Sequence, residues 1–276
     1  MNWANILTIA KKDWIEVRRN KMVVSVMLIV PLIFIIAMPL MIILIPASSP
    51  EAAQQMFQDP DLAGFMSRLP DFISQIIEGM DVTQAGIVLF LGYMFAPFFL
   101  IMPLMFASVI AAEAFAGERE RKTIEPLLYT SATDTELFLG KVLAAFVPAF
   151  LITLLAFVVY IVVVNGASYS VIGRIWFPLP SWYPLIFWVS PAISVLAIAI
   201  TVMISARVQT FMEAYQSSAA LVVLVMGLLV GQMAGVIYLS VGVGLALGAV
   251  LWIIDAVLIR IIVRTFTRPR LLSWAD

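Results

Sequence analysis

Six long apolar runs, separated by polar segments, dominate the chain. Each run is close to the roughly 20 residues that a helix needs to cross about 30 Å of hydrocarbon. The runs are continuous and do not alternate between apolar and polar positions, which excludes a membrane β-barrel. The pattern predicts an all-α polytopic membrane protein with transmembrane helices near residues 22–46, 87–112, 142–164, 185–205, 217–236 and 240–262. Only a few residues around 237–239 separate the last two runs, so a re-entrant pair is an alternative there.

Composition supports this class and narrows the chemistry. Hydrophobic residues make up 63% of the chain and charged residues only 12%, with a mean hydropathy of +1.07. Soluble domains carry about a quarter charged residues. The chain has no Cys and no His, so it lacks the thiolate, the usual general base and the commonest metal ligand. We therefore predict no catalytic residues and no metal site in this chain.

The distribution of Lys and Arg predicts the orientation. Of 16 such residues, all but Arg68 and Arg174 fall at the termini or in the 113–141 and 206–216 segments. These segments share one side of a six-span topology, and basic residues are enriched in cytoplasmic loops. We therefore expect both termini to be cytoplasmic and the protein to lie in the cell membrane.

Residues 1–21 form a separate unit before the first span. Within 2–20, one set of apolar residues recurs at spacings of three and four, as on one face of a helix: Trp3, Leu7, Ala10, Trp14 and Val17. This is typical of a helix lying in the membrane interface with Trp at headgroup depth. The alternative is a plain topogenic anchor.

Two segments are predicted on the external side. The 47–86 loop is acidic and punctuated by Pro, and one set of its apolar residues fits a helical face: Phe65, Met66, Leu69, Phe72, Ile73 and Ile76. We expect one or two short surface helices there, with a simple connector as the alternative. The 165–184 loop carries Trp176, Phe177, Trp182 and Tyr183, which predict an interfacial aromatic belt or, alternatively, part of an exit path.

The polar segment 113–141 interrupts the apolar pattern most strongly. Its sequence predicts that Gly117 bends the chain and that a short helix runs from Glu118 to Tyr129, with Glu118–Lys122 as an i,i+4 ion pair. Thr133 and Glu136 match a capping box that starts the next helix. A solvated loop needs no apolar face, so Ile124, Leu127 and Leu128 indicate that another protein packs here.

This segment closely resembles the coupling region of type-2 ABC-transporter export permeases. The matching positions are Gly117, Glu118, Arg119, Glu120, Thr123, Ile124, Glu125, Leu127 and Leu128, followed by Glu136, Leu137, Gly140 and Lys141. In that family the first nine form a coupling helix that docks into the ATP-hydrolysing subunit. The resemblance extends over the whole chain and implies a smaller cytoplasmic contact at Arg207 and Glu213. Pro126 departs from the family pattern, which more often has a helix former there.

The resemblance implies a single transmembrane domain, residues 1–276, that serves as the permease subunit of an ATP-driven exporter. No G-x-x-x-x-G-K-[ST] motif occurs, so we expect ATP and Mg²⁺ to bind to a separate ATPase subunit and no cofactor to bind to this chain. Six spans are half of the usual twelve, which implies a second permease chain, identical or different. Membrane lipid is the other expected partner, and nucleic acid is not expected. The sequence does not name the substrate.

Asp255 is the one acidic residue inside a predicted span and motivates a rival hypothesis. A charge at this depth is costly unless it is paired or hydrated. It could belong to an ion or proton path, which would make the protein an ATP-independent secondary transporter or channel. Alternatively it could be a structural partner of Arg260 or of a polar group on another helix. An intramembrane enzyme is a third possibility, but it would need more polar residues at one depth than the sequence provides.

Overall fold

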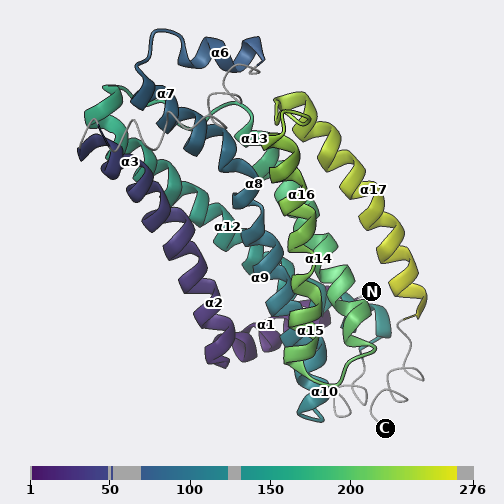
Figure 1. The fold of residues 1–276 in the computed structure, drawn as a ribbon. Coiled ribbons are helices and arrows are strands. Elements are labelled where there is room, and N and C mark those ends of the chain that lie inside the picture. Colours follow the sequence, from purple (N-terminus) through teal and green to yellow (C-terminus); the bar gives the residue numbers. More distant parts are fainter. Residues whose placement is uncertain (1, 49–50, 52–69, 124–131, 266–276) are drawn as a thin grey trace.

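Figure 1 shows the computed structural model, in which long helices run side by side and α1 (Trp3–Arg19) lies across one end of them. The structure describes residues 2–48, 51, 70–123 and 132–265. Within these residues every regular element is helical, and 6 helical segments are long and apolar enough to cross a membrane. The predicted class, an all-α polytopic membrane protein, is confirmed.

The spans are built from α-helices and short π-helical segments, which carry the label η. The first span combines α2 (Lys21–Pro31), η1 (Leu32–Ala37) and α3 (Met38–Ser48). The remaining elements are α6 (Asp71–Ile77), α7 (Val82–Leu89), η2 (Phe90–Met94), α8 (Ala96–Phe99), α9 (Ile101–Ala112), η3 (Glu113–Gly117), α10 (Glu118–Glu120), α12 (Asp134–Ile172), α13 (Trp182–Pro184), η4 (Leu185–Val189), α14 (Ser190–Ser205), α15 (Phe211–Ala219), α16 (Val222–Met233) and α17 (Val241–Thr265).

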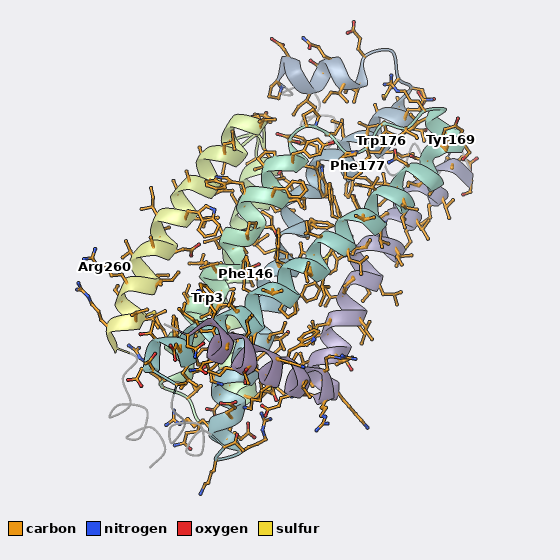
Figure 2. The ribbon with its side chains drawn as sticks, turned by 180° about the vertical axis from the view of Figure 1, so that it is seen from behind. Trp3, Phe146, Tyr169, Trp176, Phe177 and Arg260 are labelled. Carbon is orange, nitrogen blue, oxygen red and sulfur yellow. The ribbon has the colours of Figure 1, made fainter. Side chains whose placement is uncertain are left out.

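The two ends of the bundle carry different elements. α1, α10 and the start of α15 lie at one end, called the α1 end, while α6, α7 and α13 lie at the opposite α6 end (Figure 1). Figure 2 shows Trp3 and Arg260 toward the α1 end and Tyr169, Trp176 and Phe177 toward the α6 end. The basic helix ends and the aromatic loop therefore lie at opposite ends of the bundle.

α9 is the centre of the bundle. All but one of its residues are buried, and it packs against α12, α14 and α15. A helix that is apolar all round is expected at such a position. The first, fifth and sixth spans are mostly exposed, with residues such as Leu28, Val223 and Ile253 facing outward. In a membrane these faces would meet lipid or another chain.

The second span is interrupted, contrary to the single run predicted at 87–112. α7 and η2 end at Met94, and α8 begins at Ala96. Pro97 has no amide hydrogen, so the carbonyl of Tyr93, four residues earlier, loses its usual helical donor. Gln232 of α16 supplies a replacement, with its Nε2 2.8 Å from that carbonyl oxygen. A side chain from another span thus satisfies the carbonyl that Pro97 leaves without a donor.

The third span is much longer than the predicted 142–164. α12 has 39 residues, which at about 1.5 Å per residue is roughly 58 Å, nearly twice the hydrocarbon thickness. The predicted capping box of Thr133 and Glu136 is confirmed and starts the helix, while Gly173 in the left-handed conformation ends it. Much of the predicted loop at 165–184 is therefore helical.

The last two spans are separate helices. α15 and α16 together reach Met233, α17 begins at Val241, and both segments are long enough to cross a membrane. The structure therefore favours two spans over the re-entrant pair.

The predicted helix at 2–20 is present, but its buried face differs from the predicted stripe. Ile6, Ile9, Asp13 and Val17 face the protein. Trp3 and Leu7 are exposed at 60% and 61%. The apolar residues of α1 are thus divided between the bundle and its surroundings.

The aromatic loop near the α6 end is a second correction. Trp182 is fully buried and Phe177 is nearly so, and the two rings pack together with Tyr160 of α12. The indole of Trp182 donates to the carbonyl of Gly92 (2.6 Å), and the Tyr160 hydroxyl donates to that of Leu91 (2.9 Å). These residues therefore form a buried aromatic cluster that supplies hydrogen-bond donors to the interrupted second span. The belt prediction was wrong for them.

The predicted apolar face of the 47–86 segment can be checked only in part. Ile73 of α6 is buried and Ile76 is half-buried, as a surface helix with one apolar face requires. Phe65, Met66 and Leu69 lie outside the described residues.

Candidate coupling site at the α1 end

The second span continues into the polar segment as unbroken helix through Gly117. α9 leads through η3 into α10, which ends at Glu120. Lys122 then has a positive φ of 56°, so the predicted helix from Glu118 to Tyr129 does not continue through residues 121–123. Four predicted coupling residues lie outside the described part of the chain: Ile124, Glu125, Leu127 and Leu128.

Glu118 is completely buried and is the centre of a charge network. Lys141 of α12 donates to its Oε2 at 2.6 Å, and Lys12 of α1 forms an ion pair with its Oε1. Lys141 also lies 3.2 Å from Asp13 Oδ2 and donates to the Ala114 carbonyl at 2.7 Å. Glu118 therefore pairs with two distant helices rather than with Lys122, and it ties α10, α1 and α12 together.

In this network the two ammonium groups of Lys12 and Lys141 face the three carboxylates of Asp13, Glu16 and Glu118. Lys12 Nζ lies 3.3 Å from Asp13 Oδ1 and 3.1 Å from Glu16 Oε1. The oxygens of Asp13, Glu16 and Glu118 converge as they would around a metal ion, but the Lys12 ammonium already lies among them. Burial disfavours the charge on Lys12, yet the nearby carboxylates of Glu118, Asp13 and Glu16 together outweigh it, so the pKa of Lys12 is raised. Burial raises the pKa of Asp13 despite the nearby Lys141.

A second layer of polar contacts surrounds Glu113. Arg121 donates to its Oε1 and Asn20 to its Oε2, both at 2.8 Å. Asn20 also caps α2 by accepting from the Met22 amide. The end of the second span is therefore bonded to the junction between α1 and α2.

Arg119 and Glu120 connect α10 to the turn between α14 and α15. Arg119 Nη1 donates to the carbonyls of Val208 (2.9 Å) and Ser205 (3.3 Å). Glu120 accepts from the Phe211 amide at 2.8 Å, where the first turn of α15 presents free donors. The structure thus joins the two segments that the sequence predicted as separate cytoplasmic contacts.

The other predicted residues of this region have mainly local contacts. The Thr123 hydroxyl donates to the Glu118 carbonyl at 3.2 Å. Glu213 accepts from the Gln209 amide, and its own amide donates to Thr210, the N-cap of α15. Arg207 lines a groove between α14 and α17. Glu213 thus stabilises the turn that Arg119 and Glu120 hold.

α1 is held closely against α12. Glu136 accepts from the backbone amide of Asn2 (2.5 Å) and from the Asn5 side chain (3.2 Å). Gly140 faces α1, where an added Cβ would lie 2.8 Å from the side chain of Ile9. Only glycine allows this approach. The N-terminal helix is therefore an integral part of the site.

Lys12 and Asp13 are members of the charge network that the sequence analysis missed. They lie 106 and 128 residues from their partners Glu118 and Lys141. One signal was available: Asp13 shares a helical face with Ile6, Ile9 and Val17, so it was an acid on the apolar side of an amphipathic helix. Such a position demands a buried partner.

Asp255 is buried in α17, and within the described residues neither of its carboxylate oxygens has a hydrogen-bond partner. No ion pair joins it to Arg260 among these residues, so the structure does not support the proposed structural pairing. It lies apart from the α1-end network.

Comparison with known proteins identifies one family. Residues 7–262 match the family model described as ABC-2 family transporter protein. No curated protein and no solved structure matches the chain.

Proposed function

Since the chain belongs to the ABC-2 transporter family, as the permease subunit of an ABC transporter, we propose that it couples ATP hydrolysis by a separate subunit to substrate export. The observation that carries the proposal is the buried network around Glu118. It connects the end of the second span to α1 and α12, next to the segment that resembles a coupling helix. A force applied there would reach several spans at once.

In the proposed mechanism the α1 end moves as one body. Glu118, Lys141, Asp13 and Lys12 hold α10 to α1 and α12, and Arg119 holds the turn before α15. Separating buried opposite charges is costly, so these elements move together more easily than apart. Closure of the ATPase dimer would thus shift the spans as a lever, with ATP favouring the closed state.

The residues of the predicted coupling helix have two roles in this proposal. Ile124, Glu125, Leu127 and Leu128 provide the docking surface, as the family resemblance implies. Glu118, Arg119 and Glu120 transmit the movement, because their described contacts are to other parts of the same chain. In this proposal Glu118 therefore transmits movement within the chain and does not contact the ATPase directly.

Partners and orientation follow from the same proposal. ATP and Mg²⁺ bind to the ATPase subunit, and a second permease chain completes the transporter. The α1 end is cytoplasmic, because Lys11, Arg18, Arg19, Arg207 and Arg264 lie on elements of that end or on helix ends facing it. Under this orientation α6 lies on the external side.

The proposal is tested by purifying the tagged chain in mild detergent from its native host and measuring ATP hydrolysis after reconstitution. We expect a P-loop ATPase to co-purify and its hydrolysis rate to depend on the permease. Recovery of the chain without an ATPase, even after crosslinking, would contradict the proposal.

An ATP-independent transporter or channel is the second candidate, and the buried unpaired Asp255 favours it. Asp255→Asn would then abolish ion-driven flux in proteoliposomes that contain no ATP. Under the exporter proposal the same variant retains ATP-dependent activity.

A further inference from the structure

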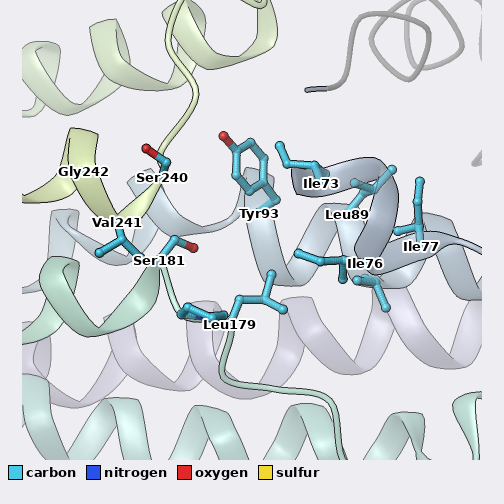
Figure 3. A pocket seen from close by; sticks show the side chains of 12 residues that line it. Ile73, Ile76, Ile77, Leu89, Tyr93, Leu179, Ser181, Ser240, Val241 and Gly242 are labelled. Atoms are coloured by element: carbon cyan, nitrogen blue, oxygen red, sulfur yellow. The ribbon is translucent and has the colours of Figure 1, made fainter. Parts of the chain in front are cut away.

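A cavity of about 480 Å³ lies at the α6 end, far from the charge network. Four separate parts of the chain line it: α6, the α7–η2 segment, the 179–181 turn and the first turn of α17. Figure 3 shows Ile73, Ile76 and Ile77 on one side and Ser240, Val241 and Gly242 on the other. Its volume is within the roughly 300–1,000 Å³ of small-molecule sites.

Among the described residues the cavity lining is apolar and carries no Asp, Glu, Lys or Arg. Its polar atoms on side chains are the hydroxyls of Tyr93, Ser181 and Ser240. Tyr93 is only 3% exposed, and its hydroxyl lies near the Leu239 backbone but has no hydrogen-bond partner in the described part of the chain. Such a site disfavours a charged ligand and fits a hydrocarbon group.

α6 covers the cavity and is attached by a small cluster distinct from the main core. Ile73 packs with Leu89, Tyr93 and Met94, and these residues form their own apolar group. A surface helix of 7 residues held mainly by such contacts can separate from the bundle at low cost compared with a core helix. The cavity therefore has a cover that can admit a chain-like ligand.

The cavity is continuous with an exposed apolar face of α17. Val241 lines it and is 43% exposed, and the exposed apolar residues Val243 and Leu245 follow on α17. A ligand dissolved in the bilayer can thus reach the cavity along an apolar surface without crossing water. This access favours a membrane lipid over a water-soluble molecule.

We propose that this cavity binds one hydrocarbon chain of a membrane lipid, taken from the half of the bilayer at the α6 end. The chain lies between α6 and the first turn of α17, and the headgroup stays outside with the polar ends of the spans. This site lies beyond the proposed coupling function and binds lipid without ATP or an ATPase subunit.

The test uses the purified full chain in nanodiscs that contain a phosphatidylcholine with a diazirine near the end of one acyl chain. After illumination, mass spectrometry locates the adducts. We expect them to concentrate on Ile73, Ile76, Ile77 and Leu89. Adducts spread over the exposed faces of α16 and α17, with none on α6 or α7, would overturn the proposal.

A cavity-filling variant with a matched control sharpens the result. Gly242 lines the cavity and an added Cβ there meets only the Ser240 hydroxyl, at 4.0 Å, so Gly242→Phe should fill the space and reduce cavity adducts severalfold. Gly227 on α16 has nothing within 4 Å and does not line the cavity, so Gly227→Phe should leave them unchanged. Adducts that persist in Gly242→Phe would contradict the proposal.

A second variant covers the case in which Gly242→Phe does not fold. Val241→Trp enlarges a partly exposed side chain of the lining and should reduce the adducts in the same way. Because all these measurements use no ATP, failure of lipid binding and failure of ATP coupling are recorded separately.

Discussion

The two ends of the bundle are held together by different physical means. At the α1 end, buried ion pairs join α1, α10 and α12 through Glu118 and Lys141. At the α6 end, neutral donors from Trp182, Tyr160 and Gln232 satisfy carbonyls of the interrupted second span. Ion pairs are strong only while every partner is present, whereas each neutral hydrogen bond contributes about 1 kcal/mol independently. We therefore describe the α1 end as all-or-none, because loss of one charged group weakens the whole network. At the α6 end, loss of one donor affects mainly its own hydrogen bond.

Removal of Lys141 should have the largest effect. Lys141→Met leaves Glu118 and Asp13 buried without their shared ammonium, which costs about 3–5 kcal/mol. Thermal unfolding in detergent should show a large decrease in midpoint. Lys11→Met, at an exposed position one residue before Lys12 on α1, is the control and should unfold like the wild type. Equal midpoints for the two variants would refute the all-or-none description.

Loss of a single neutral donor should have a smaller effect. Trp182→Phe removes the indole donor to the Gly92 carbonyl and leaves that buried oxygen unpaired, at about 1–3 kcal/mol. The same unfolding assay checks this, with Tyr183→Phe as the exposed control. A loss as large as that of Lys141→Met would mean that the two ends do not differ as described.

Arg119→Ala should affect coupling more than stability. Arg119 is half-buried and bonds to backbone carbonyls of the turn before α15, so its loss should cost at most about 1–3 kcal/mol. The variant should still bind the ATPase but should no longer change its hydrolysis rate. Arg264→Ala, at an exposed position of α17, should leave coupling intact. Normal coupling in Arg119→Ala would remove this residue from the transmission path.

Asp13→Asn should have the smallest effect, because Lys141 and Lys12 both keep Glu118 as a charged partner, and it should have a characteristic pH dependence. Burial raises the pKa of Asp13, so the folded protein binds this proton more tightly than the unfolded chain does. The contribution of this group to stability therefore falls as pH rises above about 4, the ordinary value for aspartate. Asp13→Asn should lack that decrease when unfolding is measured over this range. An unchanged pH profile would show that Asp13 does not titrate in this way.

Local patterns predicted part of this molecule well. The six apolar runs became six spans, and the Thr133–Glu136 capping box formed as expected because both residues lie within one turn. The length of α12 was not predicted, since polar residues such as Asn165 and Ser168 look like a loop in sequence but are buried here. Asn165 donates to the Phe177 carbonyl, and Ser168 accepts from the Trp176 indole.

The candidate site was only partly predictable for a similar reason. Arg119 and Glu120 were identified by resemblance, but the partner of Glu118 was assigned to Lys122, four residues away, because local spacing is all that a sequence offers. The actual partners lie on α1 and α12. Trp182 was assigned to a membrane belt because aromatic residues near the end of a span are typical of one, whereas its burial and its bond to the Gly92 carbonyl are tertiary.

The most direct test of the account is a pair of distance measurements by spin labelling, which the absence of native Cys makes clean. In the first variant the two labels are placed at Lys11 of α1 and at Lys122 after α10, both of which are exposed. In the second variant the only label is at Lys122, and the distance is measured between the two permease chains of the complete transporter. On ATP binding, the account predicts a change between the two chains and no change between Lys11 and Lys122. A shift of Lys122 relative to Lys11 would show that the α1 end does not move as one body.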